Sequence, residues 1–260
     1  MKKLFVIVMV VVLSLTAAYA DVKSDRLFQA ALLQSLMLGE YDGFVSAGGL
    51  KTYGDTGIGT FQSVNGELIM LDGVIYRALW DGSVEVVPDS ETIPFANVTF
   101  FDSDIKQENI NAESSQELKN LMTKIAAKHG KNQFYMAKVT GLMPRITVRS
   151  ELPQKEPYKP LNDALKTDQR EFTYENIHGT VVALYCPDYM DGLNTPGWHL
   201  HFISNDGKKG GHVLELAAKD CLLEMDVISE FAMIVPDRQS FNDKNLSINM
   251  KEAIQQVEGK

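Results

Sequence analysis

The stretch that decides the fold is Trp198-His199-Leu200-His201-Phe202-Ile203-Ser204-Asn205-Asp206-Gly207-Lys208-Lys209-Gly210-Gly211-His212, which holds three of the 5 histidines. Its first half is rich in residues that favour β-strands, and alternate residues of a strand point to the same face, so His199 and His201 share a face. Asp206-Gly207 is a favoured centre for a two-residue hairpin turn. Such a turn places His212 directly opposite His201, because the two lie equally far from it along the chain. The sequence therefore predicts three imidazoles that converge from two neighbouring strands.

Three converging imidazoles are typical of a catalytic zinc site, in which three protein ligands leave one position open for water or substrate. The alternative is a solvated or hydrogen-bonded His-x-His pair that holds no metal. The Gly210-Gly211 pair bears on this choice, because a register shift of one residue would turn His212 to the opposite face. We expect a Zn²⁺ site formed by His199, His201 and His212.

The first twenty residues have the features of a secretory signal peptide, with Lys2-Lys3, an apolar core and Ala18-Tyr19-Ala20 before Asp21. A membrane anchor is the alternative, which the short apolar run disfavours. We therefore expect residues 1–20 to be removed, and the mature chain to be exported to the periplasm or the extracellular medium.

The charge balance is acidic. The formal net charge is −9, and residues 1–20 carry two lysines and no acid, so their removal brings it to −11. An acidic surface disfavours nucleic acid and anionic membranes, and we expect neither as a partner of the mature form. Cys186 and Cys221 either pair in an oxidising compartment or remain as buried thiols.

The pattern of apolar residues predicts an α+β fold with few helices. Amphipathic periodicity predicts helices at residues 24–38 and 114–128, the second ended by Gly130. Short apolar runs separated by Asn-Gly and Asp-Gly turns predict a β-meander at residues 67–71, 74–79 and 84–87. Further strands are expected at residues 98–101, 181–185, 213–218 and 222–235, a pair of strands at 134–139 and 146–149, and short helices at 163–173 and 250–260.

Three prolines, Pro153, Pro157 and Pro160, indicate a stiff connector in the middle of the chain. We expect it to divide two β-rich halves. Residues 21–155 would form the N-terminal domain, and residues 156–260 would form the C-terminal domain with the histidine hairpin.

Five further motifs accompany the hairpin: Tyr41-Asp42-Gly43, Gly57-Ile58-Gly59-Thr60-Phe61, Asn65-Gly66-Glu67-Leu68-Ile69-Met70-Leu71-Asp72-Gly73, Phe172-Thr173-Tyr174-Glu175-Asn176 and Tyr185-Cys186-Pro187-Asp188-Tyr189-Met190. Together they resemble the acetolactate decarboxylase family, from about Leu27 to the C-terminus. The resemblance implies two β-rich halves with a zinc site between them, usually in a homodimer. It implies conversion of (S)-2-acetolactate to (R)-acetoin and CO2, a step of acetoin and butanediol biosynthesis.

The same resemblance assigns roles to single residues. The zinc ligands fall on the three histidines of the hairpin. A site glutamate falls on Glu67, and a polar residue near the site falls on Thr60. The site arginine falls on Arg149, nine residues before Tyr158, and Arg145 is the alternative because residues 142–145 depart from the family's usual sequence.

A C-terminal glutamate of the family falls on Glu258, with Glu252 as the alternative. The chemistry requires such groups. Loss of CO2 leaves an electron pair that the neighbouring ketone takes up as an enediolate, which a zinc ion stabilises as a Lewis acid. Arg149 suits a carboxylate or an oxyanion, and Glu67 or Glu258 would protonate the enediolate.

Two rival functions use the same histidines. A zinc hydrolase or hydratase would attack esters or CO2 with a bound hydroxide. An exported metal carrier or ligand-binding protein of cupin-like shape would bind zinc reversibly without turnover. Residue chemistry alone predicts an exported zinc protein, and the decarboxylase reading rests on the resemblance.

Overall fold

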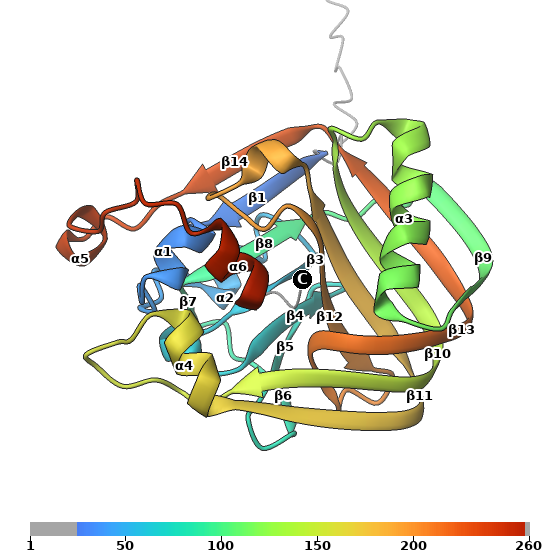
Figure 1. Cartoon of the computed structure of the whole chain (residues 1–260), viewed down its shortest axis with the longest axis horizontal. Coiled ribbons are helices and arrows are strands. Elements are labelled where there is room, and N and C mark those ends of the chain that lie inside the picture. Colours follow the sequence, from blue (N-terminus) through green and yellow to red (C-terminus); the bar gives the residue numbers. More distant parts are fainter. Residues whose placement is uncertain (1–24, 258–260) are drawn as a thin grey trace, which may run out of the picture.

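The computed structural model describes residues 25–257, which form two main β-sheets packed against each other, with helices around them (Figure 1). One sheet has seven strands. In spatial order these are β14 (Glu230–Ile234), β1 (Arg26–Ala30), β8 (Phe95–Thr99), β3 (Thr56–Thr60), β4 (Glu67–Leu71), β5 (Val74–Ala78) and β6 (Val84–Val86).

The second sheet has five strands, three of them long and strongly curved (Figure 1). In order these are β10 (Phe134–Glu151), β11 (Gln169–Cys186), β12 (Gly197–Ser204), β13 (Gly210–Ile228) and β9 (Ile105–Ala112). Because β10 also pairs with β13, the strands β10, β11, β12 and β13 close into a ring.

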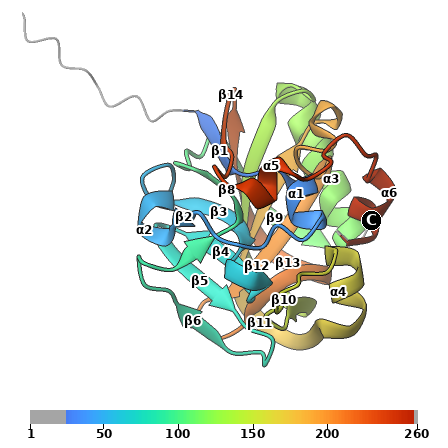
Figure 2. The ribbon, with the colours of Figure 1, turned by 90° about the vertical axis from the view of Figure 1, so that its left-hand side faces the viewer.

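The remaining elements are short, except for α3. They are α1 (Leu33–Met37), β2 (Val45–Ser46) paired with β7 (Thr92–Ile93), α2 (Ala47–Leu50), η1 (Gln62–Val64), α3 (Ser115–His129), α4 (Leu161–Asp168), η2 (Asp188–Met190), α5 (Gln239–Asn242) and α6 (Lys251–Val257). Figure 2 shows α1, α5 and α6 gathered on one side of the molecule.

Several local predictions are confirmed. The meander appears as β4, β5 and β6, joined by tight turns. The helix predicted at residues 114–128 is α3, whose first turn is capped by Ser114, since its hydroxyl accepts a hydrogen bond from Glu117 N at 3.1 Å. Gly130 ends it with a φ of +137°, a conformation that favours glycine.

The helix predicted at residues 24–38 is wrong over its first part. Residues 26–30 form β1, which pairs in parallel with β14 and antiparallel with β8, and only Leu33–Met37 are helical. The apolar spacing fits both structures. In the structure Leu27 and Phe28 are buried on opposite faces of a central strand, a tertiary environment that overrides local helical periodicity.

The pair of strands predicted at residues 134–139 and 146–149 is also wrong. Both segments belong to the single strand β10, which runs on through Gly141 and Pro144 between them. Register shifts between Thr140, Leu142 and Arg145 accommodate the irregularity without ending the strand. Other elements differ from the prediction at their ends. The strand expected at residues 98–101 is β8, which begins at Phe95. The helix expected at residues 163–173 is α4, which ends at Asp168, and residues 169–173 belong to β11.

The apolar core lies in layers. One cluster fills the space between the sheets and includes Ile58 and Ile69 from one sheet with Val182 and Ile203 from the other. A second cluster lies between α3 and the outer face of the five-stranded sheet. A third joins α1, α4 and α6 near one end of the sheets. The inter-sheet layer matters for function, because it fixes how residues of β4 meet residues of β12.

The strands of the two sheets do not divide at residue 155. β9 and β10 precede it and lie in the five-stranded sheet, and β14 follows it and lies in the seven-stranded sheet. The division into domains 21–155 and 156–260 stays a prediction. The expected signal peptide, residues 1–20, lies outside the described residues.

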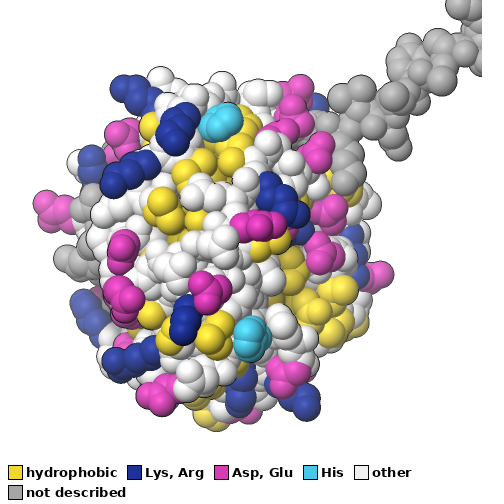
Figure 3. All heavy atoms as spheres, turned by 90° about the vertical axis from the view of Figure 1, so that its right-hand side faces the viewer, with side chains coloured by type: hydrophobic (Ala, Val, Ile, Leu, Met, Phe, Trp, Pro, Cys, Tyr) yellow, Lys and Arg dark blue, Asp and Glu magenta, His cyan; other side chains and the backbone are white. Residues whose placement is uncertain are grey.

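Cys186 and Cys221 are both buried and form no disulfide with each other, which decides between the two alternatives for the cysteines. They lie in different core clusters. Among residues 25–257 no helix is long and apolar enough to span a membrane. On the face that carries α3, basic and acidic side chains are interspersed (Figure 3).

Candidate metal centre

The centre is built on a row of residues that runs across three strands of one sheet. His201 on β12 pairs with His212 on β13, and His212 pairs in turn with Arg149 on β10. The predicted pairing of His201 with His212 is therefore confirmed. The connection is longer than the predicted two-residue turn: Ser204 N donates to the carbonyl oxygen of Lys209, and Gly207 N donates to that of Ser204, so residues 205–208 form the loop. His199 lies two residues before His201 and shares its face.

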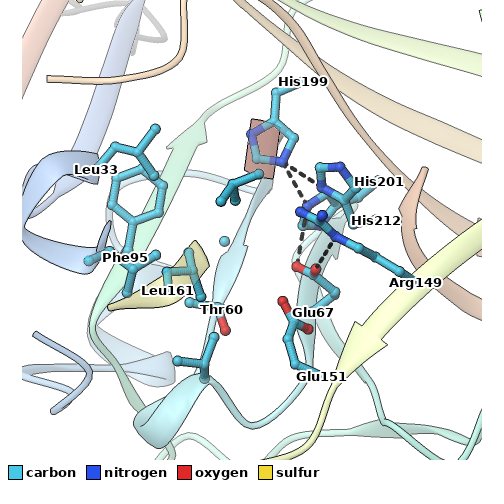
Figure 4. Close-up of a pocket in the computed structure, with 14 residues that line it drawn as sticks. Leu33, Thr60, Glu67, Phe95, Arg149, Glu151, Leu161, His199, His201 and His212 are labelled. Carbon is cyan, nitrogen blue, oxygen red and sulfur yellow. Dashed lines mark hydrogen bonds and ion pairs between the residues drawn. The ribbon is translucent and has the colours of Figure 1, made fainter. Parts of the chain in front are cut away.

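The three imidazoles converge on one point (Figure 4). Nε2 of His199 lies 3.1 Å from Nε2 of His201 and 3.0 Å from Nδ1 of His212. The rings are buried, and one nitrogen from each lies within 4.8 Å of the other two. Zinc bonds of about 2.0–2.1 Å in a tetrahedral site hold two nitrogens about 3.3 Å apart, so these side chains fit a metal ion of that kind.

Contacts outside the cluster favour the form of histidine that binds metal. Nδ1 of His201 lies 2.8 Å from the carbonyl oxygen of Leu68, which only accepts hydrogen bonds, so Nδ1 carries the proton and Nε2 keeps its lone pair. Burial, and then the charge of Arg149, hold the pKa of His212 well below its usual range. His212 is therefore neutral, as a metal ligand must be.

Glu67 reaches the histidines from the opposite sheet. Its strand β4 packs against β12, and its carboxylate Oε2 lies 3.5 Å from Nε2 of His201. The other oxygen, Oε1, lies 3.9 Å from Nε of Arg149 (Figure 4). Both Glu67 and Arg149 are buried, each about 5% exposed. The centre thus combines three histidines with an acid and a guanidinium that face each other.

The structure distinguishes the two candidate arginines. Arg149 lines the cavity that contains the three histidines, and its Nη1 donates to Oε1 of Gln169 at 3.3 Å. Arg145 lies on the same strand but is exposed and borders a separate surface pocket. Arg149 is therefore the residue placed at the centre.

Thr60 lines the same cavity and lies opposite Glu67 in the pairing of β3 with β4. Its hydroxyl donates a hydrogen bond of 2.9 Å to the carbonyl oxygen of Gly66, so its oxygen faces other groups as an acceptor. Of the candidate C-terminal acids, Glu252 is exposed on α6. Glu258 lies outside the described residues.

Sequence reasoning missed two features of the cavity. Glu151 is a second buried acid, beside Glu67 in Figure 4, and its position two residues after Arg149 on a strand was the signal for a shared face. The other is an apolar wall, whose members come from distant parts of the chain: Leu33, Leu36, Val64, Phe95, Leu161 and Val257. No local pattern brings such residues together. The cavity therefore has a polar side, with the histidines, Glu67, Glu151 and Arg149, and an apolar side.

Comparison with known proteins gives one family. The sequence model described as Alpha-acetolactate decarboxylase matches residues 27–248. An alpha-acetolactate decarboxylase from Methanosarcina mazei is 39% identical over 236 residues, which cover 90% of this chain and 81% of the relative. One from Bacillus subtilis is 32% identical over 234 residues, with coverages of 89% and 90%.

A solved structure agrees with the sequence matches. The crystal structure of alpha-acetolactate decarboxylase from Bacillus subtilis strain 168 superposes with a TM-score of 0.86 at 31% identity. The match covers 90% of this chain and all of that one. The two-sheet architecture described above is thus that of the solved relative.

Proposed function

The chain belongs to the alpha-acetolactate decarboxylase family and is a carboxy-lyase, and from this premise we propose that it works with a zinc ion held by His199, His201 and His212. The proposed reaction takes (S)-2-acetolactate to (R)-acetoin and CO2. The observation that carries the proposal is the convergence of three buried imidazole nitrogens, two pairs of them 3.0–3.1 Å apart, beside Glu67 and Arg149.

The substrate sets the chemical demand. Decarboxylation of a 2-hydroxy-3-keto acid leaves an electron pair on carbon, which the neighbouring ketone takes up as an enediolate, and one proton must then be added to give the product. A bound zinc ion would supply a Lewis acid toward the hydroxyl and ketone oxygens. The remaining tasks fall to side chains of the protein: they bind the carboxylate, exclude water and deliver the proton.

Arg149 is placed to bind the substrate's negative charge. Its guanidinium is planar, always charged and buried, and it offers several parallel donors to a carboxylate or an oxyanion. The backbone pairing of Arg149 with His212 fixes its strand next to the histidines. In a cavity from which water is excluded, such a fixed cation stabilises developing negative charge more strongly than solvent does.

Glu67 is the described acid best placed to move the proton. Its carboxylate lies between His201 and Arg149 at the oxygen-rich end of the cavity. Glu258 follows Val257 directly in the sequence, and Val257 lines the cavity, so Glu258 remains the second candidate. Protonation from one fixed side chain would add the proton to one face and so set the handedness of acetoin.

The apolar wall has two functions in this scheme. It accommodates the alkyl substituents of acetolactate, and it keeps water from the enediolate until the proton arrives. Thr60 lies between the wall and Glu67 and offers an oxygen acceptor to the substrate's hydroxyl group.

The test is turnover of racemic 2-acetolactate, followed as CO2 and acetoin, by protein that is zinc-loaded, chelated or zinc-restored. We expect turnover of one enantiomer, its loss with chelation and its return with zinc. His201→Asn should lose zinc and activity, whereas His178→Asn, an exposed histidine on β11, should keep both. A chelated protein that still produces acetoin at the full rate would contradict the proposal.

Glutamate variants test the division of roles. Glu67→Gln and Glu258→Gln should each lower turnover far more than zinc content, because a neutral amide cannot deliver the proton. If both variants keep full turnover, the assignment is wrong. Activity of the zinc-loaded protein on esters or CO2, without acetolactate turnover, would instead favour a zinc hydrolase or hydratase.

We also propose export and dimer formation. The features of residues 1–20 support secretion, with cleavage before Asp21. Sequencing the N-terminus of protein recovered from the medium or the periplasm tests this. The family resemblance supports a homodimer, and sedimentation of the purified protein tests that. The mature chain is proposed to bind neither nucleic acid nor membranes, and binding assays with DNA and anionic vesicles check this.

A further inference from the structure

The C-terminal segment returns to the metal cavity after leaving the sheet. Beyond β14 the chain passes through α5 and ends in α6, which packs against α4 (Figures 1 and 2). Ile254 and Val257 of α6 are buried in the cluster that also contains Leu33 and Leu161. We call residues 250–257 the C-terminal cover.

The cover occupies the position of a gate. Val257 lines the metal cavity and also lines a second, more open pocket along α4 and β11. Arg149 borders both as well. The last turn of α6 therefore stands where an anionic substrate would pass from the surface to the histidines.

A compact set of polar contacts holds the segment that leads to the cover. Nε of Arg238 lies 2.6 Å from Oε1 of Glu40, and the hydroxyl of Ser240 donates to the same oxygen at 2.9 Å. Arg238 also donates through Nη2 to the carbonyl oxygen of Asp42. Glu40 is buried, with its side chain 4% exposed, whereas Arg238 is 25% exposed. We call Glu40, Arg238 and Ser240 the latch.

Two further contacts continue the latch toward the cover. Nζ of Lys244 donates to the carbonyl oxygen of Leu38 at 2.8 Å, and Nε2 of Gln34 donates to that of Ile248 at 2.5 Å. On the other side of these contacts, every residue lies in the segment 34–42, which contains most of α1. Because α1 itself contributes Leu33 and Leu36 to the cavity, the segment that binds the latch also forms part of the wall that the cover closes.

We propose that Glu40 and Arg238 are positioning residues for the decarboxylation: their ion pair seats the C-terminal cover over the metal cavity, and opening of the cover admits substrate. The pair lies at the start of the C-terminal segment. Neither Glu40 nor Arg238 lines the metal cavity. It acts through α6. The linker from α5 to α6 is mostly exposed, so the cover is held by the packing of Ile254 and Val257 together with the contacts of the latch.

The proposal predicts a specific kinetic signature. If loss of the ion pair leaves the cover seated only a fraction of the time, the apparent affinity for substrate falls by that fraction, while saturating substrate restores the seated state. KM therefore rises and kcat stays nearly constant. General damage to the fold would instead remove active enzyme, which lowers kcat at constant KM.

The experiment compares four variants with the unaltered protein. Arg238→Met removes the charge and the donors but keeps the length of the side chain, and Glu40→Gln removes the charge of the partner. Arg238→Lys keeps the positive charge and should rescue most of the effect. The control is Arg26→Met, because Arg26 forms an ion pair with Glu230 of β14 at 2.8 Å but is exposed and distant from the latch in the fold.

The first measurement is hydrogen exchange in metal-free protein. We expect exchange of residues 251–257 to accelerate at least about tenfold in Arg238→Met and Glu40→Gln, with the strands of both sheets unchanged. The second is steady-state kinetics, where KM for 2-acetolactate should rise about tenfold while kcat stays within about twofold. Arg26→Met should match the unaltered protein in both.

Unchanged exchange of α6 in both latch variants, or a fall in kcat at constant KM, would overturn the proposal. So would equal acceleration in α6 and in the sheets, since that indicates global destabilisation. Should Arg238→Met fail to fold, Glu40→Gln carries the test alone. The inference rests on the proposed reaction for its kinetic readout only, so zinc-independent turnover would refute the zinc site and leave the exchange result standing.

Discussion

Replacement of Gly211 by alanine tests whether the row of His201, His212 and Arg149 depends on a close approach of two strands. Gly211 has a φ of +144°, and a Cβ atom added there would lie 2.5 Å from the carbonyl oxygen of Arg149 and 3.1 Å from Cβ of Val148. Ordinary contact begins at 3.4 Å, so the β10 backbone would have to retreat by about 0.9 Å. The atom that must move belongs to the arginine of the centre.

Two costs add in Gly211→Ala. The strained backbone conformation costs about 1–3 kcal/mol, and separation of β10 from β13 weakens their hydrogen bonds and packing by a further 1–2 kcal/mol or so. We expect the free energy of unfolding to fall by roughly 2–5 kcal/mol. Zinc affinity should fall at least about tenfold, because His212 moves relative to His199 and His201.

Gly73→Ala provides a matched control. Gly73 also has a positive φ, +80°, but an added Cβ would meet no atom within 4 Å. It carries the backbone cost alone, about 1 kcal/mol, with no change in zinc affinity. The assays are urea denaturation of the metal-free proteins and zinc titration against a competing chelator. If the two variants lose the same stability and both bind zinc like the unaltered protein, the close approach does not support the centre.

Two further predictions concern stability away from the metal. Burial, and then the neighbouring Asp104, Asp25 and Asp102, raise the pKa of Asp226 from 3.8 to about 7, and its Oδ1 has no hydrogen-bond partner. The folded protein therefore holds a proton that the unfolded chain releases above pH 3.8, so this group's contribution to stability falls between about pH 4 and 7. Urea denaturation of Asp226→Asn should show a gain of up to about 4 kcal/mol at pH 8 that vanishes near pH 4, and an equal gain at both pH values would exclude this cause. Ser114→Ala removes the cap of α3 and should cost about 1 kcal/mol in urea denaturation without altering zinc affinity.

The parts of this structure that follow from sequence are those fixed by short-range geometry. The pairing of His201 with His212 is centred between Asp206 and Gly207, where the sequence predicts the hairpin turn. The start of α3 is set by Ser114. In both cases a turn or a cap within a few residues determines the outcome, so no knowledge of distant segments is needed.

The failures arise where distant segments decide. Residues 26–30 have a spacing that fits a helix, yet they form β1 because β8 and β14 offer their edges on either side. The sequence predicts two strands at residues 134–139 and 146–149, yet β10 continues through both because it is paired on both sides over most of its length. Residue chemistry alone did not bring Glu67 to the histidines, because its position depends on the packing of one sheet on the other.

The origin of the site's components in separate layers has a functional consequence. The metal ligands and Arg149 belong to one sheet, on strands that close into a ring, so their mutual distances are held by backbone pairing. Glu67 belongs to the other sheet and reaches them only through the apolar inter-sheet cluster. The cover packs on α1 and α4, and the ion pair of Glu40 and Arg238 holds the segment that leads to it. If the three parts act as we propose, different interactions would govern each function: the strand register would govern metal affinity, inter-sheet packing would govern proton delivery by Glu67, and the latch would govern access of substrate.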